Sequence, residues 1–173
     1  MRQAPITSPP RQSSAGGFTL IELLVVIAII GLLSSIVLAS LNVARAKARD
    51  AERLSDMHQL QSALEMYAND HNSSYPSTGG SWWGNCSGYG SHSTSGANGW
   101  IPNLAPTYIA KLPLDPNPQL PSYCYLYRSD GKDYMLLVYM TVESYSQAAN
   151  QWLRPGSPAQ KDFAFYTSGA SRW

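Results

Sequence analysis

An uninterrupted apolar run near the amino terminus constrains this chain more than any other feature. Residues 23–41 contain no ionisable side chain, and a helix of about nineteen residues is roughly 28 Å long. That length matches the hydrocarbon core of a bilayer, which is about 30 Å thick. A fully buried helix of a soluble protein is the alternative, but a chain of 173 residues has little other core to surround it. The run therefore predicts a membrane-spanning helix within residues 18–44.

A short polar leader, residues 1–17, precedes the run and carries Arg2 and Arg11 but no acid. An ordinary secretory signal places small residues after its apolar stretch, where it is cleaved. Here the paired glycines, Gly16 and Gly17, stand before that stretch. Cleavage after Gly17 would remove the leader and leave the apolar helix on the mature protein.

The junction that starts at Gly17 reads GFTLIELL and resembles the prepilin motif of type IV pilins and type II secretion pseudopilins. The resemblance implies cleavage between Gly17 and Phe18 by a prepilin peptidase, methylation of the new amino terminus on Phe18, and a functional carboxylate at Glu22. Many type IV pilins also have a proline in the second half of this helix. None occurs between Phe18 and Tyr75, which favours a major pseudopilin over a typical long-pilus subunit.

Glu22 is the one charged residue in residues 18–44. A charge at the centre of a membrane helix costs about 2.5–3.5 kcal/mol, less near an end, and indicates function. In a bundle of such helices Glu22 would be buried, and the amine on Phe18 of a neighbouring copy is the nearest suitable cation. We therefore expect an intersubunit salt bridge, with a carboxylate that only reaches the membrane surface as the alternative. Gly31 costs about 1 kcal/mol inside a helix, which indicates close helix packing or local melting.

The number of cations on each side of the apolar run predicts a membrane topology opposite to the one that the leader implies. Arg2 and Arg11 precede the run, whereas four cations follow it: Arg45, Lys47, Arg49 and Arg53. Counted alone, they place the carboxyl-terminal side in the cytoplasm. The leader motif and the cysteines favour the reverse, and we expect a single-pass protein of the inner membrane with an extracytoplasmic head.

After residue 44 the pattern becomes amphipathic, and we expect the helix to continue over residues 45–72. Apolar side chains recur at spacings of three and four, as on one face of a helix. These positions are Leu54, Met57, Leu60 or Gln61, Leu64, and Tyr67 or Ala68. Charged and polar residues are expected on the other faces: Asp50, Glu52, Arg53, Asp56, His58 and Glu65. A polar stretch, residues 69–74, is the predicted end of the helix.

Residues 73–173 are predicted to form a small globular head, giving an α+β fold with the long helix packed on a small antiparallel sheet. A long loop rich in Ser, Gly and Asn covers residues 75–103. Three strands are expected at residues 123–127, 134–142 and 163–167, because these segments are rich in strand-forming residues. Asp130 and Gly131 mark a hairpin between the first two.

Cys86 and Cys124 are the only cysteines, and an even number in an exported domain predicts one disulfide, with two buried thiols as the alternative. We expect no cofactor. Metal binding is not expected either, because there is no CxxC motif and the histidines lack ligand-like spacing. Some major pseudopilins have a calcium loop near the carboxyl terminus, but residues 167–173 lack the acids for one.

No catalytic motif is present, so we expect a protein that is not an enzyme. The aspartates in polar stretches, which include Asp70, Asp115, Asp130 and Asp133, are more typical of turns than of active sites. The favoured function is a structural subunit that polymerises through its apolar helix into a type IV pilus or a type II secretion pseudopilus, a filament outside the cell or in the periplasm. Before assembly its partner is membrane lipid. The resemblance implies further partners: copies of itself, the prepilin peptidase, an assembly ATPase and a platform protein of the inner membrane.

A second hypothesis is a minor pilin, adhesin or DNA-uptake component. Trp82, Trp83, Tyr89 and Trp100 lie on the polar loop and would stack on sugars or on single-stranded DNA bases. The favoured role of these rings is instead to cover a small core beneath the loop, which has little other apolar content. The formal net charge of +1 argues against nucleic-acid binding by bulk charge.

Overall fold

The computed structural model describes residues 17–117, 123–143 and 162–173. Residues 1–16 of the expected leader lie outside these ranges. Contacts within the chain divide it into two units, which meet between Leu41 and Asn42. The first unit holds the apolar part of the long helix, and the second holds the rest of that helix with the head.

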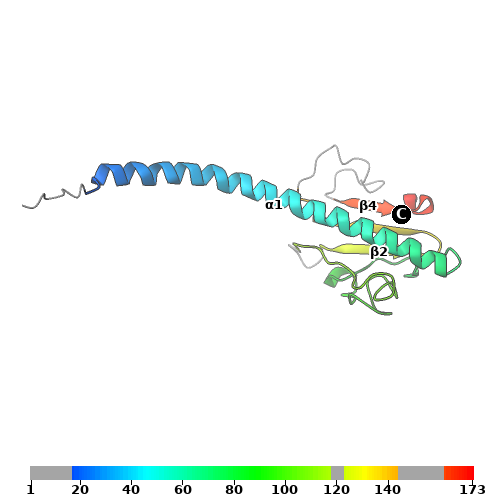
Figure 1. The fold of residues 1–173 in the computed structure, drawn as a ribbon. Helices are drawn as coiled ribbons and strands as arrows, with labels where there is room; N and C mark the ends of the chain where they lie inside the picture. Colours follow the sequence, from blue (N-terminus) through cyan, green and yellow to red (C-terminus); the bar gives the residue numbers. More distant parts are fainter. Residues whose placement is uncertain (1–16, 118–122, 144–161) are drawn as a thin grey trace, which may run out of the picture. The chain divides into compact units, whose positions relative to one another are not determined.

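One helix, α1, runs over Leu20–Asp70, which confirms the long helix expected from the apolar run and the amphipathic pattern (Figure 1). No proline interrupts it. It ends where the backbone turns left-handed at Asn72 and Ser73, with φ angles of 53° and 59°. The Ser73 amide donates to the carbonyl of Ala68, which satisfies one of the last helical acceptors.

The head contains a four-stranded antiparallel sheet in the order β1-β2-β3-β4. The strands are β1 (Trp83–Gly84), β2 (Tyr125–Ser129), β3 (Tyr134–Val138) and β4 (Phe163–Tyr166). The α+β class is confirmed, but three strands were expected, and the sheet has a fourth. Strand β1 was missed because two residues within a Ser/Gly loop carry no alternating pattern.

The two faces of the sheet are buried against different partners, because successive side chains of a strand point to opposite faces. On one face, Tyr125 and Tyr127 of β2 pack with Leu60 and Leu64 of α1 in the main core. On the other face, Leu126 belongs to a smaller core with a partial cover of aromatic rings. Figure 1 shows β2 and β4 beside the second half of α1.

Candidate functional site

The apolar part of α1 has no partner within the chain. The most apolar window of α1 has a mean hydropathy of 2.8, and none of it is buried. By length and composition, α1 is the one helix among the described residues that is able to cross a bilayer. Apolar exposure on this scale indicates a surface for lipid or for another protein. Its large exposed side chains include Leu20, Leu24, Ile30, Leu33 and Val37.

Glu22 caps the helix to which it belongs. The backbone amide and the hydroxyl of Thr19 both donate to Glu22 Oε2, each at 2.8 Å, and the Glu22 amide donates to Thr19 Oγ1 at 3.3 Å. This reciprocal pattern is a capping box, which satisfies amides at a helix start that have no acceptor within the helix. The Thr-x-x-Glu spacing indicates such a box in the sequence. This box was not predicted from the sequence, because the one partner expected for Glu22 was the amine on Phe18 of a neighbouring copy.

The expected processing site lies directly before this cap. Gly17 and Phe18 are exposed and precede the helix, and Phe18 keeps 94% of its surface accessible. Gly31 lies within α1, and a β-carbon added there would meet nothing within 4 Å. No contact within the described chain therefore requires glycine at this position.

A buried ion cluster attaches α1 to the head. Arg53 is fully buried, and its guanidinium makes a bidentate pair with Asp115, with N···O distances of 2.8 and 2.9 Å. Arg53 Nη1 also donates to Asp50 at 2.7 Å and to Glu143 at 3.1 Å. Arg49, one turn earlier, donates to Glu143 through Nε at 2.7 Å. The cluster thus joins three segments that are far apart in the sequence.

The electrostatics of this cluster favour the charged forms of Glu143 and Arg53. Hydrogen bonds from Arg49 and then from Arg53 lower the pKa of Glu143 to about 2, against the opposing effect of burial. Burial disfavours the charge on Arg53, but its hydrogen bonds with Asp115, Asp50 and Glu143 outweigh this effect and raise its pKa. A buried cation is tolerated here because carboxylates surround it.

The cluster corrects two expectations. Arg53 was expected on a polar face of the helix, away from the apolar stripe, but it is one of the largest fully buried side chains. Asp115 was taken as a turn former, and its Oδ1 does accept the Asn117 amide at 2.8 Å. The same carboxylate also binds Arg53, and no local pattern distinguishes the two roles.

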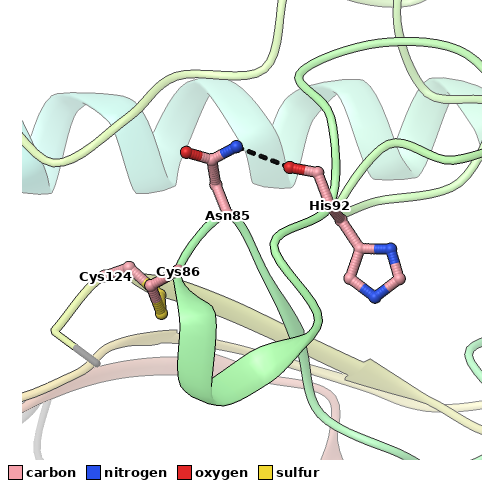
Figure 2. Close-up of a disulfide and its surroundings, with 4 residues drawn as sticks. All are labelled: Asn85, Cys86, His92 and Cys124. Carbon is pink, nitrogen blue, oxygen red and sulfur yellow. Dashed lines mark hydrogen bonds between the residues drawn. A yellow bond between two sulfur atoms is a disulfide. The ribbon is translucent and has the colours of Figure 1, made fainter. Parts of the chain in front are cut away.

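Cys86 and Cys124 form a disulfide between the long loop and the residue before β2 (Figure 2). The loop is held further by Asn85, whose amide donates to the carbonyl oxygen of His92. The His92 ring stacks on Trp83 at 4.0 Å between centroids. The disulfide and these contacts give the loop a defined conformation despite its low apolar content.

The tryptophans of the loop do not form one ligand-binding surface. Trp100 is fully buried in the main core, which agrees with the favoured core role and contradicts the alternative that this ring contacts a ligand. Its ring fills space among Leu104, Leu112 and other apolar residues of that core. Trp82 and Trp83 remain half-buried, and each makes its own set of contacts. Within the described residues, no group of His, Cys, Asp and Glu is arranged to hold a metal ion.

Comparison with known proteins agrees with the motif at the junction. A family described as the prokaryotic N-terminal methylation motif matches residues 12–38. The type II secretion system core protein G of Klebsiella michiganensis is 47% identical over 68 residues, which cover 39% of this chain and 47% of that protein. Its counterpart from Pectobacterium carotovorum is 48% identical over 62 residues, covering 36% of this chain and 39% of the relative.

A pilus protein is similar as well. The type IV wide pilus major component of Thermus thermophilus is 43% identical over 60 residues, which cover 35% of this chain and 46% of that protein. These matches span less than half the length of each relative. No solved structure gives a significant match. The relatives are named as a core protein of a secretion system and as a major pilus component rather than as enzymes, and they support a structural, pilin-like subunit. The chain thus carries the prokaryotic N-terminal methylation motif and is confirmed to resemble the type II secretion pseudopilins and type IV pilins.

Proposed function

We propose that this chain is a filament subunit that is held in a membrane by the apolar part of α1 and then exchanges lipid for the same helix of other copies. The observation that carries the proposal is the apolar helix surface, which is exposed throughout residues 20–38 and follows directly on the processing motif. Apolar burial drives both states, so one segment serves first as anchor and later as filament core. Processing between Gly17 and Phe18, with methylation of Phe18, precedes assembly.

Glu22 is suited to act in both states. In the free subunit its Oε2 accepts both hydrogen bonds from Thr19, while Oε1 accepts none from the described residues. A carboxylate has two oxygens with several acceptor positions. Oε1 can therefore bind the amine on Phe18 of a neighbouring copy without loss of the helix cap. This bond would set the stagger between subunits, and Gly31 would allow close approach of neighbouring helices.

The head is proposed to lie outside the cytoplasm. The disulfide supports this orientation, because disulfides persist in oxidising compartments. Of the four cations after the apolar run, Arg49 and Arg53 are neutralised in the ion cluster, so the folded flank presents less charge than the sequence count indicates. The prepilin peptidase, an assembly ATPase and a platform protein of the inner membrane are the proposed partners.

A type II secretion pseudopilus is the proposed assembly, in preference to a long pilus. Helix α1 lacks a proline, and several relatives are named as type II secretion system core protein G. In the native host, deletion of the gene is expected to stop secretion through that system. Loss of surface pili with normal secretion would instead support the pilus assignment.

The test of the assembly bond separates the charge of Glu22 from its capping role. Glu22→Gln supplies a side-chain amide whose oxygen is able to complete the capping box, and it removes the charge. Thr19→Ala is the matched variant, because it weakens the cap and leaves the carboxylate in place. Both proteins are expected to insert and to be processed, which a gel shift of the mature product measures.

Filament yield after shearing should then distinguish the two variants. Glu22→Gln is expected to lose most filaments, whereas Thr19→Ala should keep them. Equal filament yield in Glu22→Gln and the wild type would refute the salt bridge. A bulky residue at Gly17 should leave the precursor uncut, and efficient cleavage of that variant would place the processing site elsewhere.

A further inference from the structure

Arg128 of β2 lies close to two tryptophan rings on the sheet face opposite α1. Its guanidinium carbon is 5.8 Å from the ring centroid of Trp82 and 4.9 Å from that of Trp173. All three residues are half-buried, so each keeps part of its surface accessible. Cations over an indole face are attracted by the negative π-surface of the ring.

The fold holds both rings in place. Strands β1 and β2 pair Trp83 with Tyr127, and the same register brings Trp82 opposite Arg128. Trp173 follows a short 3-10 helix, η3 (Ser168–Arg172), which is tied to the end of the β2–β3 hairpin. There Asp133 accepts a hydrogen bond from Thr167 Oγ1 at 2.6 Å and one from the Gly169 amide at 3.2 Å. Rings fixed in this way lose little freedom when a ligand binds.

No described carboxylate neutralises the charge of Arg128. Among the described residues no carboxylate lies within ion-pair distance of its guanidinium, in contrast to Arg49 and Arg53. Its Nε is buried and finds no hydrogen-bond acceptor in the part of the chain that the structure describes. The rings stabilise the cation but offer no acceptor oxygen to its N–H groups. A carboxylate is the complementary ligand, since guanidinium binds it through two parallel hydrogen bonds.

We propose that Trp82, Arg128 and Trp173 form a binding site for a carboxylate-bearing sugar of an acidic polysaccharide. The sugar carboxylate binds the guanidinium, and the C–H face of the sugar ring packs on indole. Single-stranded DNA fits less well, because it needs a positive groove that follows its backbone. The site differs from the tryptophan set expected from the sequence, because Trp173 takes part and Trp100 does not.

The test measures binding of oligogalacturonate to the full chain in detergent by isothermal titration calorimetry. Three comparisons decide the result: the same oligosaccharide with its carboxyls methyl-esterified, the Arg128→Gln variant, and the Arg172→Gln variant. Arg172 is the matched control, because it is an exposed cation next to Trp173 and outside the ring pair. Near-ultraviolet circular dichroism establishes that each variant keeps the wild-type fold.

Esterification and Arg128→Gln are each expected to weaken binding at least about tenfold, while Arg172→Gln changes it by less than about twofold. Trp173→Ala should also weaken binding while leaving the charge in place. The proposal is overturned by no binding of the oligogalacturonate, or by equal losses in the Arg128 and Arg172 variants. It is also overturned by tighter binding of an oligothymidylate, which would identify the site as one for nucleic acid.

Discussion

Replacement of Arg53 by Met tests whether the buried ion cluster holds the head on α1. Arg53 is fully buried and pairs with three carboxylates, one of which, on Asp115, is itself 1% exposed. Methionine fills much of the same volume without charge, so Asp115 would stay buried without a cation. Removal of one partner of a buried ion pair costs about 3–5 kcal/mol.

The assay is thermal unfolding of the full chain in detergent, followed by near-ultraviolet circular dichroism of the head aromatics. Even at about 2 °C per kcal/mol, the expected loss lowers the midpoint by at least about 6 °C. Arg49→Met is the matched control, since this arginine lies one turn away, is 30% exposed and, among the described residues, forms an ion pair with Glu143 only. Its midpoint should fall by less than half as much. Equal drops in the two variants would refute the special role of the buried cation.

A second substitution separates the lost pair from damage to packing. In the double variant Arg53→Met with Asp115→Leu, neither end of the bidentate pair remains. Replacement of a buried ion pair by apolar residues is often close to neutral. The double variant should therefore regain part of the midpoint lost in Arg53→Met. A further drop, equal to the sum of two independent losses, would show that the pair is not coupled.

Three other predictions concern the head. The pKa of Glu143 is lowered to about 2, from 4.5 in the unfolded chain, so its stabilising effect is complete above pH 4.5 and is lost as the pH falls toward 2. In Glu143→Gln, the midpoint of thermal unfolding should therefore depend less on pH over that range. Replacing both Cys86 and Cys124 by Ser should cost about 4 kcal/mol by the loop-entropy model, since 38 positions separate them. No change on reduction of the wild type would contradict this. Trp100→Ala should cost about 3–5 kcal/mol in denaturant unfolding, and an unchanged midpoint would argue against its core position.

Much of the fold follows from local patterns in the sequence. Helix α1 was predicted because a bilayer-length apolar run continues into a stripe of period 3.6, and both signals depend on near neighbours. Strands β2, β3 and β4 lie within or close to segments rich in strand formers. Strand β1 escaped prediction, since two residues are ordered only by pairing with β2.

The proposed functional residues divide in the same way. The processing motif and Glu22 are recognisable because a few consecutive residues define them. The capping box between Thr19 and Glu22 is also local, since the two residues are three positions apart. Trp100 and Trp82 lie in the same polar loop, but Trp100 is buried in the core and Trp82 lies beside Arg128. Sequence composition alone does not separate these two environments.

The sequence by itself determined the apolar helix and the motif at its start, because hydrophobicity and helix capping act over adjacent residues. Only the tertiary structure decided which charges are buried. Arg53 meets Asp115 across 62 positions and Glu143 across 90, and no local pattern encodes partners at such distances. Burial of a cation is favourable only when the whole fold brings carboxylates around it.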